Sequence, residues 1–214
     1  MESSPSNLVQ LYQQNTHRSQ SADFLRVAQI GFIHLDWYPI TALVERWRPE
    51  THIFHLPCGE CTITLQDVAI QFGLRVDGQP LTGSLQYDWK NICEELLGVL
   101  PDDLKGSRSS ILWLASQFPE LPPDADDINV RRYARAYIMQ LIGGFLFADK
   151  SNNLLSCSSC YCLDFEHAGT YSWGGAYLAW LYRELCRAIN AQPLEITLLQ
   201  LWAYDRFPIV ALQV

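Results

Sequence analysis

The sequence contains little lysine and little charge of any kind. Only three of its 214 residues are lysine, and its 15 lysines and arginines face 23 acidic residues, a formal net charge of −8. This balance argues against a general nucleic-acid coat protein, which needs a basic face. None of the lysines stands in an apolar context that would suit a Schiff base; they are Lys90, Lys105 and Lys150.

Common catalytic signatures are absent as well. The chain has no phosphate-binding Gly-x-x-x-x-Gly-Lys-Ser/Thr, no dinucleotide-binding Gly-x-Gly-x-x-Gly and no Gly-x-Ser-x-Gly nucleophile turn. Its most apolar run, residues 137–148, is too short to span a bilayer and is typical of a buried core helix. We therefore predict a chain that is not an enzyme and that uses no cofactor.

What the chain does contain is material for a core. Hydrophobic residues make up 49% of it and aromatic residues 12%, with seven tryptophans. Apolar residues recur at helical spacing, and capping or breaking residues separate the periodic segments. We predict a mainly α fold, a multi-helix single domain over residues 22–214 that follows a flexible arm, residues 1–21. The expected helices are 23–30, 39–47, 65–72, 88–97, 110–118, 128–147, 173–189 and 196–206. Thr64 is expected to cap the third of these, with Asp67 in its favourable first turn, and Ser172 is expected to cap the seventh.

A small β-hairpin is expected in the N-terminal third. Two short β-prone runs flank the turn residues Pro57 to Glu60. Residues 76–81, which contain an Asp-Gly turn, could pair with this hairpin in one small sheet. Within the long helix, Gly143 and Gly144 indicate either the close approach of a neighbouring helix or a kink.

Two cysteine pairs have the spacing of zinc ligands. They are Cys58 with Cys61, and Cys157 with Cys160. The interval between the pairs is far longer than in compact zinc modules, so the tertiary fold would have to bring them together. The alternative is that the first pair lies in the hairpin and the others pack as small apolar side chains. Neither pair opens a helix in a βαβ setting, which a redox Cys-x-x-Cys needs.

A short acidic segment offers a second hypothesis for metal binding. Asp164, Glu166 and His167 could bind a divalent ion or exchange protons, as in a metal-dependent hydrolase. No second cluster of histidines or carboxylates stands out as their partner, and a solvated loop explains the same residues.

Five arginines form the most basic surface that the sequence predicts. Arg183 and Arg187 lie one helical turn apart and could hold a phosphate or an acidic partner. Ion pairs within the fold, for example with Glu184 or Asp126, are the alternative use for these side chains. The full set of possible contacts to an anionic partner is Arg131, Arg132, Arg135, Arg183 and Arg187.

Three blocks of sequence, taken together, carry a family resemblance. The first includes Trp47-Arg-Pro-Glu-Thr-His-Ile-Phe-His-Leu-Pro-Cys-Gly-Glu-Cys61 and runs to Gly83; the second is Tyr133 to Ser151; the third is Tyr171 to Arg187, followed by Leu199-Gln-Leu-Trp-Ala-Tyr-Asp-Arg-Phe-Pro208. In this order they resemble the plant mobile domain, also called the aminotransferase-like plant mobile domain, of the MAINTENANCE OF MERISTEMS-like proteins and of the long-form homologues of serine/threonine-protein phosphatase 7.

The resemblance implies a plant nuclear protein with a mainly helical fold. It implies a non-catalytic protein-interaction domain acting in meristem maintenance, transposon silencing and genome stability, with a phosphatase-like nuclear protein as a partner. It implies no transaminase, because no pyridoxal-binding lysine can be carried over. A nucleic-acid-binding, transposon-derived domain that uses the five arginines is an alternative, although the net charge of −8 opposes it.

The match departs from the family in two places. Residues 155–163 are rich in cysteine and serine where the family has an apolar segment, which weakens the zinc hypothesis. The family domain continues beyond Pro208, so the chain resembles its N-terminal portion and is expected to be truncated. We therefore expect the apolar side chains of the last helix to stay partly exposed and to drive self-association or partner binding, with Trp202 or Trp113 near the contact.

Overall fold

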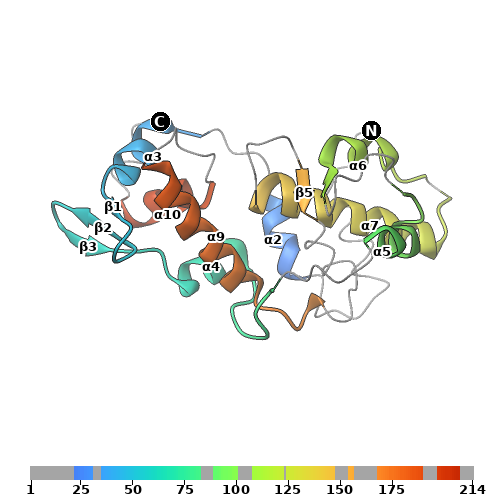
Figure 1. Ribbon diagram of the computed structural model, residues 1–214, viewed down its shortest axis with the longest axis horizontal. Helices are drawn as coiled ribbons and strands as arrows, with labels where there is room; N and C mark the ends of the chain where they lie inside the picture. Colours follow the sequence, from blue (N-terminus) through green and yellow to red (C-terminus); the bar gives the residue numbers. More distant parts are fainter. Residues whose placement is uncertain are drawn as a thin grey trace. The chain divides into compact units, whose positions relative to one another are not determined.

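The computed structural model describes residues 22–30, 35–82, 89–100, 108–122, 124–147, 154–156, 168–189 and 197–207. Within these ranges lie eight α-helices, one π-helical turn and five short strands (Figure 1), so the mainly helical fold is confirmed. The chain groups into two compact units: unit 1 contains residues 1–29 and 79–171, and unit 2 contains residues 30–78 and 172–214. The predicted arm, residues 1–21, lies outside the described residues, and its boundary stays a prediction.

Unit 1 is built largely from helices that are neighbours in the sequence. Helix α7 contacts both α5 and α6, and β4 pairs antiparallel with β5, with Arg108 opposite Ser156. The elements are α2 (Ala22–Ile30), α5 (Trp89–Leu97), β4 (Arg108–Ser110), α6 (Ile111–Gln117), α7 (Asp127–Leu141), the π-helical turn η1 (Ile142–Leu146) and β5 (Leu154–Ser156).

Helix α7 changes its geometry at the glycine pair. The helix predicted over 128–147 is α-helical as far as Leu141, and the glycines fall in the π-helical turn that follows. Gly144 is exposed, and a Cβ added to it would meet no atom within 4 Å. Close approach of a neighbour therefore does not explain this glycine. Instead it coincides with a widened turn, one of the features that bend helices.

Unit 2 joins segments that are far apart in the sequence. Helix α9 contacts α4 and β1, and α10 contacts α3 and α4. No helix in the described ranges, here or in unit 1, is both long and apolar enough to cross a membrane. The elements are α3 (Trp37–Val44), β1 (Trp47–Arg48), β2 (Ile53–Leu56), β3 (Gly59–Cys61), α4 (Leu65–Phe72), α9 (Trp173–Ala188) and α10 (Thr197–Arg206).

The sheet of unit 2 contains the predicted hairpin. Strands β2 and β3 pair antiparallel, with Phe54 opposite Cys61, and the strand order is β1-β2-β3. The third strand is β1, and the prediction that residues 76–81 extend this sheet was wrong. Of those residues, Gln79 forms an isolated bridge with Tyr171, which belongs with it to unit 1.

The helix predicted over 39–47 also ends earlier than expected. Helix α3 stops at Val44, and Trp47 lies in β1 opposite Phe54, although its spacing continues the helical apolar stripe. Pairing with β2 places the two rings 4.8 Å apart, and Trp47 is only 1% exposed. Tertiary packing of a large aromatic side chain thus outweighs the local helical pattern.

An aromatic cluster forms the centre of unit 2. The Trp47 ring lies 5.3 Å from that of Tyr182, and Phe54 stacks on Trp202 at 5.4 Å. The Trp47 indole Nε1–H donates to Cys186 Sγ over 3.3 Å, and the Tyr182 hydroxyl donates to a backbone carbonyl of the segment after β3 over 2.6 Å. These contacts connect α9 and α10 to the sheet, which positions the walls of the groove described next.

Candidate functional site

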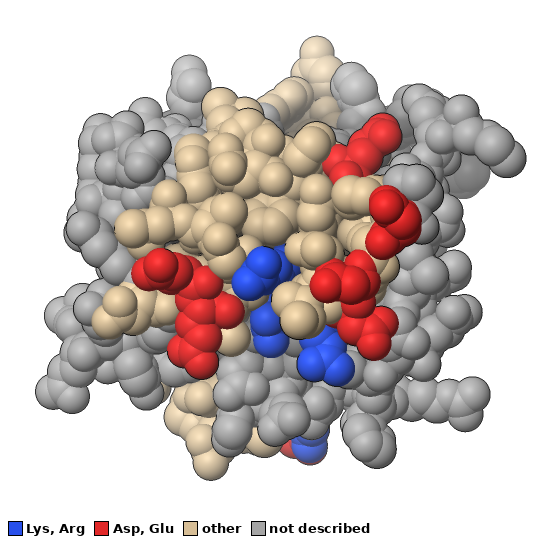
Figure 2. All heavy atoms as spheres, turned by 90° about the vertical axis from the view of Figure 1, so that its right-hand side faces the viewer, with Lys and Arg blue, Asp and Glu red and all other residues tan. Residues whose placement is uncertain are grey.

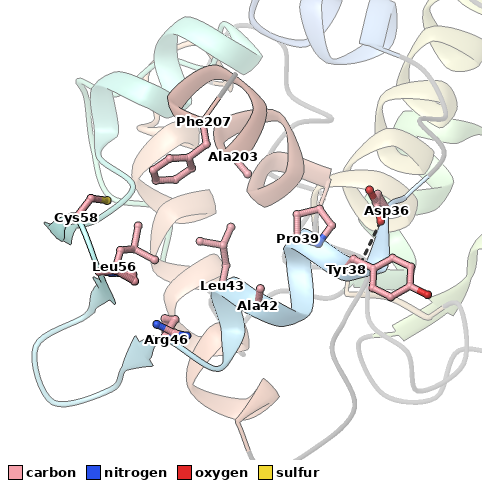
Figure 3. Close-up of a pocket in the computed structure, with 11 residues that line it drawn as sticks. Asp36, Tyr38, Pro39, Ala42, Leu43, Arg46, Leu56, Cys58, Ala203 and Phe207 are labelled. Carbon is pink, nitrogen blue, oxygen red and sulfur yellow. Dashed lines mark hydrogen bonds between the residues drawn. The ribbon is translucent and has the colours of Figure 1, made fainter. Parts of the chain in front are cut away.

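Unit 2 contains a groove between α3, the β2–β3 turn and the end of α10. Its main compartment has a volume of about 600 Å³. Figure 3 shows Leu43, Leu56 and Phe207, from these three parts of the unit, on different sides of one space. The walls are mostly aliphatic and aromatic, and they comprise Asp36, Tyr38, Pro39, Ala42, Leu43, Arg46, Leu56, Pro57, Cys58, Ala203 and Phe207.

Hydrogen bonds hold α3 against α10 at one end of this compartment. The Asp36 carboxylate accepts from the Tyr38 backbone N–H over 3.1 Å and caps α3. The Asp36 backbone N–H donates to Gln200 Oε1 over 2.8 Å, and the Gln200 amide donates to the Tyr204 hydroxyl over 3.3 Å. The side chain of Gln200 is buried, so this end of the groove is a fixed wall.

The rim of the main compartment carries exposed aromatic and basic groups. Tyr38 is 89% exposed and its neighbour Trp37 is 44% exposed, both in the first turn of α3. Arg46 lines the groove, is exposed, and has no hydrogen-bond or ion-pair partner for its guanidinium among the described residues. Tyrosine, tryptophan and arginine are the side chains enriched at the centres of protein–protein contacts.

A side compartment of about 260 Å³ adjoins the main one. The two compartments share Leu56, Cys58 and Phe207 as wall residues, and together they are called the docking groove below. The other walls of the side compartment are more polar and come from β3 and the end of α10; they are Gly59, Glu60, Cys61, Thr62, Trp202 and Arg206.

A buried acid holds Arg206 at the side compartment. One oxygen of Asp67 lies 2.8 Å from Arg206 Nη2, and the other accepts from the Thr64 backbone N–H at 2.8 Å and from its hydroxyl at 2.7 Å. Burial alone would raise the pKa of Asp67, but the hydrogen bonds from Thr64 and Arg206 outweigh it and hold the pKa below its ordinary value. The Arg206 side chain stays 53% exposed.

The capping box of α4 explains why Asp67 lies there. Thr64 is the N-cap, its hydroxyl accepts from the Asp67 backbone N–H at 3.3 Å, and the Asp67 side chain returns to the Thr64 backbone. The sequence predicts the Thr64 cap and the favourable place of Asp67 in the first turn. It does not predict Arg206 as their partner, because the ion pair links residues 139 apart in the chain.

Trp202 has an unsatisfied polar atom. The residue is 1% exposed and lines the side compartment, with its ring 6.0 Å from that of Phe207. Its indole Nε1–H is buried and has no acceptor in the part of the chain that the structure describes. A buried donor without an acceptor costs on the order of 1–3 kcal/mol, so such groups in a native fold call for an explanation.

The burial of Trp202 corrects part of one prediction. The sequence predicts that the apolar side chains of the last helix stay partly exposed. Leu201, and Phe207 directly after the helix, are half-buried, but Leu198, Leu199 and Trp202 are 1% exposed or less. These three pack inside unit 2, where α10 contacts α3 and α4. Self-association of the chain stays a prediction, and the buried side chains of α10 do not support it.

The candidate zinc ligands are only partly described. Cys58 is exposed and Cys61 is half-buried, both at the hairpin turn; Cys157 and Cys160 lie outside the described residues. Burial, and then the neighbouring Cys58, raise the pKa of the Cys61 thiol, against a smaller effect of Arg206. No three metal-ligating side chains gather within the described ranges. Asp164, Glu166 and His167 are also outside those ranges, so both metal hypotheses stay predictions.

Two of the candidate arginines in α7 contact the end of α5 in unit 1. Arg135 Nη1 donates to the Leu96 carbonyl over 3.0 Å, and the Arg132 guanidinium occupies the space that a Cβ on Gly98 would need. Gly98 has φ +74° and its N–H donates to the Glu94 carbonyl over 2.9 Å, as in a left-handed helix end. Cations are favourable at this negative end of a helix. Arg131, which belongs to α7 like Arg132 and Arg135, is exposed.

The arginines of unit 2 share one acid. Arg183 Nε lies 3.3 Å and Arg187 Nη1 lies 3.1 Å from the same Glu184 oxygen, and the Glu184 side chain is 7% exposed. Contacts of these two arginines to an anionic partner stay a prediction, as for the three in unit 1. The sequence singles out neither Arg46 nor Arg206, because only the tertiary fold brings them to one groove.

Comparison with known proteins identifies relatives over nearly the whole chain. The profile of the plant mobile domain family matches residues 23–214. An Arabidopsis thaliana protein named serine/threonine-protein phosphatase 7 long form homolog is 50% identical over 187 residues, which cover 84% of this chain and 14% of that protein. No solved structure matches the chain.

Two further relatives come from the same plant. Protein MAINTENANCE OF MERISTEMS is 42% identical over 183 residues, and Protein MAIN-LIKE 1 is 42% identical over 194 residues. The matches cover 82% and 86% of this chain but 38% of each relative, so the chain spans well under half the length of these proteins. Because the family profile and the relatives agree over the described helices of both units, the chain belongs to the plant mobile domain family.

Proposed function

We propose that this chain is a non-catalytic protein-interaction domain and that its partner binds in the docking groove. The observation that supports the proposal is the groove itself, which is large, mostly apolar and lined at its rim by the exposed Tyr38. An apolar side chain that enters the main compartment would remove its own surface and that of the groove walls from water. This removal is the main source of affinity in such contacts.

The rigidity of the walls also favours binding. Asp36 and Gln200 connect α3 to α10, and the Asp67–Arg206 pair connects α4 to the end of α10. A preformed groove loses little conformational entropy when a partner docks, so more of the contact energy remains as affinity.

The biological setting of the proposal comes from the relatives. One of them is named for meristem maintenance, and we propose that this chain acts in the same process in the nucleus, together with transposon silencing. A phosphatase-like nuclear protein is the proposed class of partner. The word phosphatase in the name of the other relative describes that protein and assigns no catalysis to this chain.

A charged side chain in the groove wall tests the proposal. Ala42 is exposed and lines the main compartment, so Ala42→Glu places a carboxylate among apolar walls without removing a core residue. Thr41→Glu is the matched control, because Thr41 is the preceding exposed residue of the same helix and does not line the groove.

The measurement is quantitative recovery of partners by tagged protein from plant nuclei, followed by titration of the recovered partner in purified form. We expect Ala42→Glu to weaken binding at least tenfold and Thr41→Glu to leave it within twofold. Equal affinities for both variants would show that partners bind elsewhere on the chain.

Nucleic-acid binding is the weaker candidate. Four of the five candidate arginines make contacts inside their own units. On the face shown in Figure 2, basic atoms form a small central group with acidic groups on both sides, and no broad basic area is seen among its described residues. A gel shift with DNA or RNA that weakens steeply with salt would favour this candidate over protein docking.

A further inference from the structure

Both arginines of the docking groove keep donors without acceptors, whereas its acids already have donors. Arg206 gives one Nη to Asp67, and its other N–H groups have no acceptor among the described residues. Arg46 has no polar partner for its guanidinium there either. The groove therefore offers two guanidinium groups, one in each compartment.

The acids in the walls are engaged locally. The Asp36 carboxylate accepts from the Tyr38 N–H at 3.1 Å, and Glu60 lies 3.2 Å from His55 Nε2. Asp67, behind Arg206, offsets part of its charge, but it also holds the guanidinium in place through Nη2. The planar arginine fork keeps its remaining N–H groups available for a second carboxylate.

From this arrangement, and on the basis of the proposed function, we infer that the groove binds a partner segment in which a bulky apolar residue is flanked by acidic side chains. The apolar side chain would occupy the main compartment. One carboxylate would accept from Arg206 in the side compartment, and a second would bind Arg46.

The two arginines explain the choice of an internal acidic segment over a chain terminus. Arg46 lines only the main compartment and Arg206 only the side compartment. A C-terminal carboxylate could bind one of them, whereas acidic side chains on both sides of an apolar residue can bind both. Because Leu56, Cys58 and Phe207 are common to both compartments, neighbouring residues of one segment can reach both.

The test uses three fluorescent peptide libraries and the purified full chain. The first carries Glu-x-Leu-x-Glu between random residues with an amidated end, the second carries Gln-x-Leu-x-Gln in the same frame, and the third ends in a free Leu carboxylate without acidic side chains. We expect the first library to bind at least tenfold more tightly than either of the others.

Two variants assign the preference to the groove. Arg46→Gln removes a guanidinium that has no polar partner among the described residues, and we expect it to reduce binding of the acidic library at least threefold. Arg48→Gln, an exposed arginine of the same unit that does not line the groove, is the matched control and should leave binding unchanged.

Arg206→Lys keeps a positive charge beside Asp67 but removes the fork, so we expect at least a fivefold loss for the acidic library. Thermal unfolding of this variant checks that it folds.

The outcomes separate this inference from the proposed function. If all three libraries bind equally and Ala42→Glu abolishes their binding, the groove docks apolar segments and the acidic preference is wrong. If the free carboxylate library binds best, the occupant is a chain end and the inference is overturned. If the acidic library binds wild type and Ala42→Glu alike, both the groove and the inference fail.

Discussion

Each unit of this protein contains a pair of adjacent glycines in a helix, and the two pairs serve different ends. In unit 1, Gly144 lies in the π-helical turn after α7, with no atom within 4 Å of where a Cβ would be. In unit 2, a Cβ on Gly174 would lie 2.8 Å from Val76 Cγ1 and 3.1 Å from the Arg75 carbonyl. Gly144 thus lies at a change in helix geometry, and Gly174 lies at a close backbone contact.

The contact at Gly174 shows how unit 2 is assembled. The Gly174 N–H donates to the Arg75 carbonyl over 2.7 Å, and the Ser172 hydroxyl donates to the Val76 carbonyl over 2.8 Å while it caps α9. The start of α9 is therefore fixed to a segment about a hundred residues earlier in the chain. In unit 1, the described contacts of α7 are with α5, α6 and η1, which lie nearer to it in sequence.

The largest expected effect separates the two glycines. Gly174→Ala forces its Cβ against Val76 and the Arg75 carbonyl, and we expect it to lower the free energy of unfolding by about 1–3 kcal/mol, the usual cost of overpacking. Gly144→Ala meets no atom and gains helix propensity, so we expect no loss and up to about 1 kcal/mol of stabilisation. Urea denaturation of both variants measures the difference. Equal losses would show that the two pairs do not differ in packing.

A second comparison concerns what an arginine binds in each unit. In unit 2, Arg206 pairs with the buried Asp67 carboxylate at 2.8 Å; in unit 1, Arg135 binds the Leu96 carbonyl at 3.0 Å. Because only the first acceptor titrates, only the first contact depends on pH in the acid range. The pKa of Asp67 is lower in the folded state than its ordinary value. Its contribution is therefore complete above the unfolded-state pKa of about 4 and is lost as the pH falls through the folded-state pKa.

Two variants test this difference. We expect Asp67→Asn to cost about 1–2 kcal/mol at pH 7, the order of a hydrogen-bonded charge pair with one half-exposed partner, and to cost progressively less below pH 4. Arg135→Met removes the donor to the Leu96 carbonyl, which does not titrate, and should cost about 1 kcal/mol at pH 7. Thermal unfolding at pH 7 and pH 3 gives both numbers. A cost for Asp67→Asn that does not change with pH would contradict the assignment of the acid-labile contact.

The same contrast between local and long-range contacts decides what the sequence could predict. The helix of residues 65–72, the caps at Thr64 and Ser172 and the hairpin turn depend on neighbours within a few residues, and all were predicted. The strand at Trp47 was missed because its burial depends on Phe54 and Tyr182, and the latter is 135 positions away.

The docking groove was missed for the same reason. Its walls come from α3, the hairpin turn and α10, and no local pattern brings Arg46 and Arg206 to one groove. Arg183 and Arg187, which the sequence did single out, share the buried Glu184 on their own helix. The sequence pattern therefore shows where basic side chains lie on a helix. Only the tertiary fold shows which of them keep N–H groups without an acceptor among the described residues.

The smallest expected effect concerns two left-handed positions, one in each unit. Gly98 has φ +74° at the end of α5, and glycine adopts a positive φ without steric cost. His52 has φ +54° in the loop between β1 and β2. A side chain in this region costs roughly 1 kcal/mol or more. The His52 ring stacks on Tyr182 at 5.2 Å with an interplanar angle of 14°, and the Thr62 hydroxyl donates to the His52 carbonyl over 2.7 Å. The stack therefore offsets the backbone strain.

Two substitutions at His52 separate the strain from the stack. His52→Ala keeps the strain and removes the ring, so it should destabilise unit 2 by about 1 kcal/mol, the typical value of an aromatic pair. His52→Gly removes both, and because the two contributions oppose each other its stability should stay close to that of the wild type. Chemical denaturation should thus place the alanine variant about 1 kcal/mol below the glycine variant. If the two variants are equally stable, the left-handed backbone at this position carries no strain, and the loop between β1 and β2 accommodates histidine without help from the contact with Tyr182.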